Sequence, residues 1–157
     1  MRSLVGCLVL VVSIAGLAAG AGSAAPAAAP CEVTESDGFG PFGRGGSPPA
    51  RAVFGKGFVL SGKVLRSLDC KQLANATVEI WQAGKGGVYD KRGRASIVTG
   101  KNGAFKFTGP PPVSYEGVTP HIHVRVSHEG YDEVATTVRV TKNAKGAQLE
   151  IVLGSLL

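Results

Sequence analysis

From Phe58 onward the chain is a succession of short segments in which apolar and polar residues alternate, and this pattern constrains the fold most strongly. Alternation puts every second side chain on the same face of a strand, so each segment can bury one face. Beyond the first 25 residues, no window sustains the 3.6-residue period of an amphipathic helix. Strands are expected over residues 57–65 and 76–83, twice within 95–107, twice within 120–140, and over 147–153.

About seven short strands at close spacing predict an all-β fold, specifically an antiparallel β-sandwich. Two turn signals divide the longer segments. Lys101, Asn102 and Gly103 separate two short strand-like runs, which predicts a β-hairpin. Glu129 and Gly130 separate the next pair of runs in the same way. The sequence contains no internal repeat.

The N-terminal third of the chain has a different composition. Residues 1–25 carry one early arginine, an apolar run and then small residues, which is typical of a secretory signal peptide. The run is too short, and too soon diluted by Ala and Gly, for a permanent membrane span. Residues 26–56 are rich in Ala, Pro and Gly and predict an irregular arm before the sandwich of 57–157. We expect a secreted or periplasmic protein with no stable membrane span after processing.

Export gives the cysteines a specific meaning. Of the three cysteines, Cys7 lies in the predicted signal peptide, which leaves Cys31 and Cys70. An even pair in an oxidising compartment predicts a disulfide between them. A metal site built on both thiolates is the alternative, but no Cys-x-x-Cys spacing accompanies it.

The charge balance argues against one class of partner. The chain has 17 Lys and Arg against 11 Asp and Glu, a net charge of +6, and the basic residues are scattered along it. No basic patch interleaved with aromatic residues is present. Nucleic acid is therefore not an expected partner.

The stretch "TPHIHVRV", residues 119–126, places two histidines one residue apart in a predicted strand. Strand geometry puts His121 and His123 on one face and the branched aliphatic residues between and after them on the other. The apolar face can then pack in the core while both imidazoles project from the same side toward one metal ion. A half-exposed strand with histidines on its wet face is the alternative interpretation.

Several motifs in order resemble the intradiol ring-cleavage dioxygenases of the catechol and protocatechuate type. They are "ATVEIWQAGKGGVYD", then "GAFKF", a Pro-rich loop ending in Tyr115, and "PHIHV", preceded by an arm containing "TESDGFGPF". The resemblance extends over roughly residues 34–131. It implies a transthyretin-like (prealbumin-like) β-sandwich that cleaves the ring of a catechol with O2 between the two hydroxylated carbons.

The resemblance also implies a set of metal ligands. Tyr89 and His121 would be equatorial ligands of Fe(III), and Tyr115 and His123 would be axial ligands. Fe(III) is a hard ion that suits anionic oxygen donors, with imidazole completing the set. By the same resemblance, Tyr115 would take a proton from the bound catechol as a general base. A small aromatic diol and O2 are the implied partners.

The match is incomplete, and one departure bears directly on catalysis. Ring-cleaving members of the family carry an arginine two residues before the residue that precedes His-x-His, and here Val118 or Thr119 occupies that place. Arg92, Arg94 and Arg125 are candidates to supply the charge, although solvent exposure is the expected state of all three.

Two other functions therefore stay open. One is a non-catalytic, transthyretin-like sandwich that binds a carbohydrate, a protein or a metal. The other is a zinc hydrolase using His121, His123 and His128, although strand parity puts His128 on the other face and no catalytic carboxylate stands beside it. The particular catechol and the oligomeric state do not follow from the sequence.

Overall fold

Seven strands carry almost all of the regular structure of the computed structural model, which describes residues 30–38, 40 and 46–156. The predicted signal peptide lies outside these residues. Within them, no helix is long and apolar enough to cross a membrane. Two single-turn 3₁₀ helices, η1 (Lys85–Gly87) and η2 (Lys91–Gly93), lie between the second and third strands. The strands are β1 (Phe58–Arg66), β2 (Thr77–Trp81), β3 (Arg94–Val98), β4 (Ala104–Gly109), β5 (His121–Ser127), β6 (Val134–Arg139) and β7 (Gly146–Leu153).

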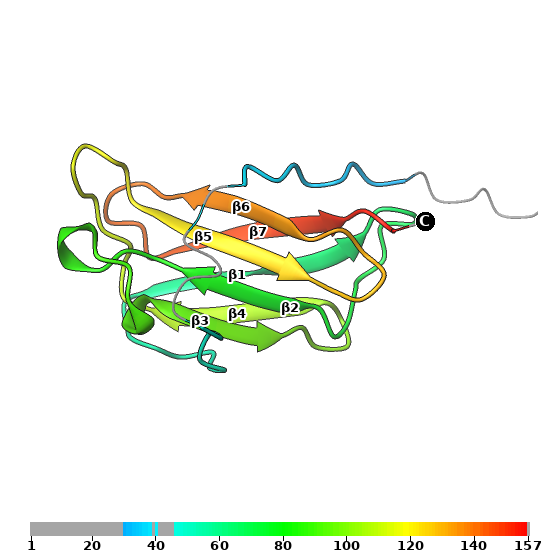
Figure 1. The fold of residues 1–157 in the computed structure, drawn as a ribbon, viewed down its shortest axis with the longest axis horizontal. Helices are drawn as coiled ribbons and strands as arrows, with labels where there is room; N and C mark the ends of the chain where they lie inside the picture. Colours follow the sequence, from blue (N-terminus) through cyan, green and yellow to red (C-terminus); the bar gives the residue numbers. More distant parts are fainter. Residues whose placement is uncertain (1–29, 39, 41–45, 157) are drawn as a thin grey trace, which may run out of the picture.

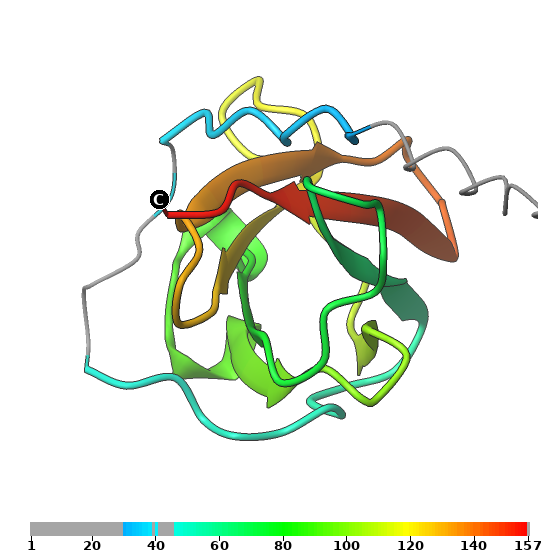
Figure 2. The ribbon, with the colours of Figure 1, turned by 90° about the vertical axis from the view of Figure 1, so that its right-hand side faces the viewer.

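The strands form two facing sheets, one with the order β4-β1-β7 and the other with the order β3-β2-β5-β6 (Figures 1 and 2). All pairs are antiparallel except β1 and β7, which run parallel. The predicted all-β sandwich is confirmed. The parallel pair brings the first and last strands together in the three-stranded sheet.

The hairpin predicted within residues 95–107 is wrong. β3 pairs with β2 and β4 pairs with β1, so the connection crosses from one sheet to the other. The Thr99 hydroxyl holds this connection against the β1–β2 loop, because it donates to the carbonyl of Leu73 and accepts from the backbone N–H of Ala76. The second predicted pair is correct, since β5 and β6 are hydrogen-bonded neighbours.

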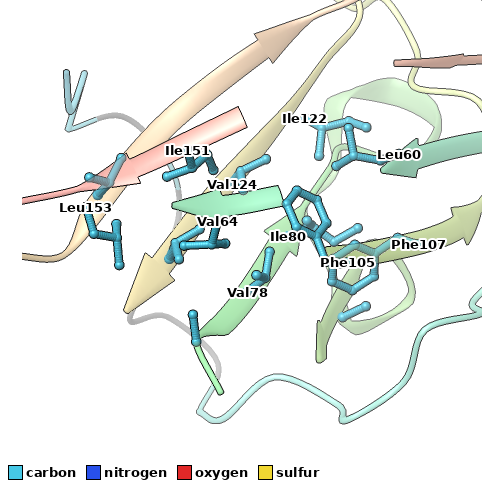
Figure 3. Packing of buried hydrophobic residues seen from close by; sticks show 14 of the residues in the cluster. Leu60, Val64, Val78, Ile80, Phe105, Phe107, Ile122, Val124, Ile151 and Leu153 are labelled. Atoms are coloured by element: carbon cyan, nitrogen blue, oxygen red, sulfur yellow. The ribbon is translucent and has the colours of Figure 1, made fainter. Parts of the chain in front are cut away.

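The core lies between the two sheets (Figure 3). Alternation in each strand sends its apolar residues inward, as in Phe105 and Phe107 of β4 and in Val78 and Ile80 of β2. These side chains are at most 4% exposed. Burying such side chains contributes about 1.5–3 kcal/mol each before conformational entropy is counted.

The described parts of the predicted arm, residues 30–38, 40 and 46–56, contain no helix or extended strand, and they follow the open sides of the sandwich (Figure 2). The part over residues 31–37 forms backbone hydrogen bonds with β7 at Val152 and with β6 at Ala135. The part over residues 50–54 forms them with β3 at Ser96 and with β4 at Thr108. Both parts cover strand edges that would otherwise present unpaired N–H and C=O groups.

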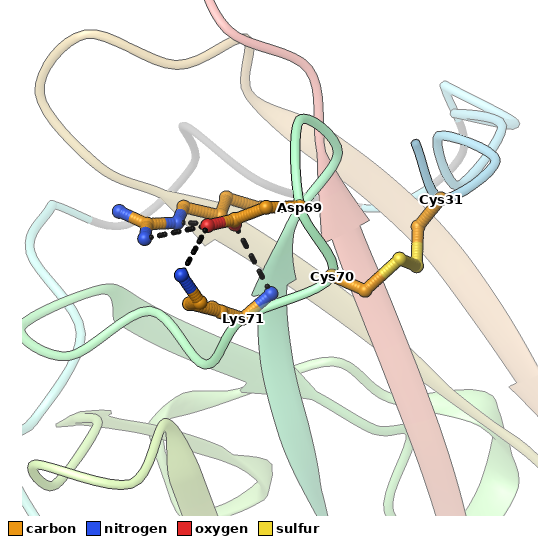
Figure 4. The surroundings of a disulfide bond; sticks show 5 residues. Cys31, Asp69, Cys70 and Lys71 are labelled. Carbon is orange, nitrogen blue, oxygen red and sulfur yellow. Dashed lines mark hydrogen bonds and ion pairs between the residues drawn. A yellow bond between two sulfur atoms is a disulfide. The ribbon is translucent and has the colours of Figure 1, made fainter. Parts of the chain in front are cut away.

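A disulfide joins the arm to the sandwich (Figure 4). Cys31 is bonded to Cys70 of the β1–β2 loop, with 5.3 Å between their Cα atoms. Beside it, Asp69 accepts from the Arg66 guanidinium at 2.6 Å and from the backbone N–H of Lys71 at 3.2 Å. The predicted pairing of the cysteines is the one found, and it fixes the beginning of the arm.

Candidate metal centre

Two imidazoles project from the outer face of the four-stranded sheet. His121 and His123 lie on β5, where the alternation sends Ile122 and Val124 into the core on the opposite face. Both histidines are 8% exposed, because the loops that follow β2 and β4 cover them. The prediction that both histidines share one face of the strand is therefore correct, but this face is not exposed to solvent.

Tyr89 comes from the loop that connects β2 to β3, and the end of β2 holds this loop in place. The indole N–H of Trp81 donates to the carbonyl of Asp90 at 3.2 Å, and the Trp81 ring meets the Tyr89 ring edge to face. The Asp90 carboxylate caps η2 by accepting from the backbone N–H of Arg92 at 2.8 Å. These contacts place the phenol of Tyr89 over β5.

Tyr115 comes from the Pro-rich loop that connects β4 to β5. The buried amide of Gln82 donates to the carbonyl of Pro110 at 2.9 Å, which ties this loop to the end of β2. Figure 1 shows the two loops at the same end of the sandwich. Trp81 thus holds the loop that carries Tyr89, and Gln82 holds the loop that carries Tyr115. In the sequence these two residues were noted only as part of a family motif.

Local backbone geometry fixes the Tyr115 ring. A tight turn follows it, with positive φ at Glu116 and Gly117, and its backbone pairs with Val118. The ring packs against Gly87 of η1, where an added Cβ would lie 2.6 Å from the nearest ring atom. Gly87 also has a φ of +77°, so glycine is required there both for backbone conformation and for room.

The four predicted ligands meet at one point. The Tyr89 hydroxyl lies 3.1 Å from the Tyr115 hydroxyl, 2.8 Å from Nε2 of His121 and 3.0 Å from Nε2 of His123. The four residues come from three separate segments of the chain. The structure therefore brings together all four residues that the resemblance implied.

Each imidazole has a partner for its other nitrogen, and the sequence analysis found neither partner. Nδ1 of His121 donates to the carbonyl of Thr119 at 2.8 Å, and in the neutral imidazole this tautomer carries its lone pair on Nε2. Nδ1 of His123 lies 3.2 Å from the Thr137 hydroxyl on β6. Thr137 is the cross-strand neighbour of His123, so the β5–β6 register was the signal that could have identified it. Such partners orient metal-binding histidines.

Burial, and then the hydrogen bond and charge of Tyr115, raise the pKa of the Tyr89 phenol well above its usual range. Without a cation, Tyr89 is therefore neutral at physiological pH. A metal ion that binds its oxygen must displace the proton, which makes metal affinity dependent on pH.

The arginines named as candidates for the missing charge are engaged elsewhere. Arg94 is buried, against expectation: it pairs with Glu79 at 2.6 Å and lies over the Trp81 ring. Arg125 pairs with the other Glu79 oxygen at 2.7 Å, whereas Arg92 is exposed and pairs with Asp90. The buried Glu79 carboxylate explains why Arg94 is enclosed.

His128 does not join the other two histidines. It follows the end of β5, about five residues or roughly 16 Å along the chain from His123. No three His, Cys, Asp or Glu side chains gather into a group in the part of the chain that the structure describes. The site depends instead on two tyrosines and two histidines.

Comparisons with solved structures bear on the fold. The dioxygenase domain of a dioxygenase carbohydrate-binding protein fusion from the cellulolytic bacterium Streptomyces sp. SirexAA-E matches 80% of this chain and 100% of its own length, with 25% identity and a TM-score of 0.66. Hydroxyquinol 1,2-dioxygenase from Pseudomonas putida DLL-E4 matches 83% of this chain and 68% of its own, with 17% identity and a TM-score of 0.61.

Catechol 1,2-dioxygenase from Acinetobacter sp. ADP1 matches 71% of this chain, with 20% identity and a TM-score of 0.60, and this chain spans 60% of that protein's length. No family model matches the sequence, and no curated protein matches it. The sequence resemblance and the structural likeness thus point to the same group of proteins: this chain has an intradiol dioxygenase-like fold.

Proposed function

We propose that this chain is an exported, non-haem Fe(III) protein that binds a catechol and cleaves its ring with O2 between the two hydroxylated carbons. The observation that carries the proposal is that a second phenol oxygen and two imidazole nitrogens lie within 3.1 Å of the Tyr89 oxygen. The fold supports it, because proteins with this likeness include catechol and hydroxyquinol dioxygenases.

The donor set fits ferric iron. Separations of 2.8–3.1 Å from the Tyr89 oxygen to its three neighbours suit adjacent ligands of one ion that lies about 2 Å from each donor. Two phenolates offset two of the three charges of Fe(III), and imidazole suits iron as well. Tyr89, Tyr115, His121 and His123 would hold the ion. Bound there, Fe(III) would supply the Lewis acidity that makes a chelated catechol reactive toward O2.

The residues of the chain contribute orientation and proton transfer. The carbonyl of Thr119 keeps the proton of His121 on Nδ1, so that Nε2 offers its lone pair to the centre. Tyr115 is the proposed general base, which accepts a proton from a catechol hydroxyl on its phenolate oxygen. Its ring rests on Gly87 and its backbone on the turn to Val118, so the oxygen stays near the donors.

Export is supported by the disulfide between Cys31 and Cys70, because disulfides persist in oxidising compartments. The predicted signal peptide over residues 1–25 agrees with it.

Oxygen uptake tests the proposal. The iron-loaded mature protein, given catechol, hydroxyquinol and protocatechuate, should consume O2 and form muconate-type products. A variant carrying both Tyr115→Phe and His123→Ala is the control. If the wild type consumes no more O2 than this control, the dioxygenase proposal falls and a non-catalytic binding module takes its place.

A further inference from the structure

A small pocket of about 180 Å³ adjoins the two histidines on their β6 side. Its lining residues come from the turn before β5, from β5 itself and from β6: Val118, Thr119, His121, His123, Thr137 and Arg139. Val118 supplies an apolar surface that is 42% exposed. No carboxylate lines the pocket.

Arg139 is the one cationic side chain of this lining. It stands directly opposite His121 in the β5–β6 register, and its residue is exposed. Its guanidinium makes no hydrogen bond or ion pair with the residues that the structure describes, 30–38, 40 and 46–156. The three arginines considered from the sequence all have carboxylate partners. Arg139 therefore keeps its donors available to a ligand.

The chemistry of the lining indicates what this ligand carries. A guanidinium presents a planar fork of N–H donors that matches a carboxylate. Because Val118 and Arg139 line the same pocket, a ligand there has an apolar side chain and a guanidinium available to it. Because no carboxylate lines the pocket, no negative charge in the lining repels an anionic substituent.

We propose that Arg139 makes this pocket selective for catechols that carry an anionic ring substituent, such as a carboxylate. The inference rests on the proposed function, because it assumes that a catechol occupies the space beside the histidines. Arg139 is assigned a role in recognising the substituent, not in the ring-opening step.

Binding measurements test this role separately from turnover. Calorimetric titrations of the full mature protein, iron-loaded and without O2, would compare 3,4-dihydroxybenzoate with catechol. The wild type should bind the carboxylated ligand about tenfold to a hundredfold more tightly than Arg139→Ala does, the range expected for a charge-assisted hydrogen bond. Catechol affinity should change less than about twofold, and Arg139→Glu should prefer catechol.

Lys106→Ala is the matched control, because it removes one exposed positive charge from the other sheet. It should leave both affinities unchanged. The inference would be overturned if Arg139→Ala weakened the affinities for 3,4-dihydroxybenzoate and catechol equally. It would also be overturned if the substitution lowered kcat and left both affinities intact.

The same titrations on the metal-free protein, with 4-hydroxybenzoate and phenol, separate this inference from the proposed function. If the protein takes up no iron, the proposed function fails, and a preference for 4-hydroxybenzoate that disappears in Arg139→Ala still supports the anion site. If the iron-loaded protein opens catechol rings but shows no preference that depends on Arg139, the inference alone fails.

Discussion

Two polar clusters share the outer face of the four-stranded sheet, and they satisfy their polar atoms in different ways. In the first, the buried Glu79 carboxylate is held by Arg94 at 2.6 Å and by Arg125 at 2.7 Å. Arg94 also donates to the carbonyl of Gly46 in the arm and lies 4.4 Å from the centre of the Trp81 ring. This ionic cluster contains both signs of charge and needs no external ion.

The second cluster, around Tyr89, consists of lone-pair donors without a cation of its own. Three atoms with lone pairs lie within hydrogen-bonding distance of the Tyr89 hydroxyl, which has a single proton to give. Arg92 and Arg94, which follow Tyr89 in the chain, are held by carboxylates. The difference teaches that the charges of the first cluster satisfy one another, whereas the second cluster holds lone pairs that, as we propose, bind a metal ion.

The largest effect should come from breaking the ionic cluster. Glu79→Gln removes the charge but keeps the shape, and it leaves the buried Arg94 without its counter-ion. Removing one partner of a buried pair typically costs about 3–5 kcal/mol. Urea denaturation should show this loss, whereas Arg125→Gln, which removes the more exposed partner, should cost less; equal losses would contradict the description of the cluster.

Reduction of the disulfide should lower stability by up to about 4 kcal/mol, because the bond closes a loop with a sequence separation of 39. Both polar clusters should survive, since Cys31 and Cys70 lie outside them. The check is urea denaturation with and without reductant, together with iron content. A thiol titration of the denatured, unreduced protein should find no free thiol, and two free thiols would refute the bond.

Thr137→Val should act on the tyrosine–histidine cluster alone. It removes the hydroxyl beside Nδ1 of His123 and keeps the size of the side chain. Loss of such a partner typically weakens metal binding by about tenfold to a hundredfold. Competition with a chelator measures the iron affinity; Thr136→Val, its neighbour on β6, is the control. An unchanged affinity in Thr137→Val would show that the hydroxyl does not support His123.

The smallest effect concerns a third polar pair, the half-buried Arg66 and Asp69. The hydrogen bond from Arg66 lowers the pKa of Asp69 from 3.8 to about 2. A depressed pKa means that the pair stabilises the folded state above about pH 4, and that this contribution is lost as the pH falls through about 2. The stability difference between the wild type and Asp69→Asn should shrink over this range. A difference that does not change with pH would mean that the carboxylate is not coupled to folding.

The sequence predicted the parts of this molecule that depend on local alternation. Strand parity put His121 and His123 on one face, whereas the resemblance to the intradiol dioxygenases implied that Tyr89 and Tyr115 lie near them. The same reasoning could not distinguish a hairpin from a crossing between sheets at residues 99–103, because both need the same turn residues. That choice depends on long-range contacts such as those of Thr99 with Leu73 and Ala76.

The alternation of side chains along a strand also gave no information about the segments that cover the outer face of the sheet. An outward-facing arginine was expected to be exposed, yet Arg94 is covered because the arm and the Trp81 ring lie over it. Arg139 was not recognised as a neighbour of the histidines, because that position depends on the register of β5 with β6, which could not be predicted from the sequence. Strand parity and the family resemblance therefore singled out the four candidate ligands, whereas strand register and the covering loops decide what surrounds them.

The most direct test of the central claim is an Fe(III) titration of the metal-free protein followed by visible absorption. Tyrosinate bound to Fe(III) gives a charge-transfer band, so the account predicts a coloured protein that saturates at one iron per chain. Tyr89→Phe and His121→Ala should each lower the iron content and weaken the band. A wild type that stays colourless with iron, or that retains zinc instead, would contradict the claim that these four residues form a ferric site.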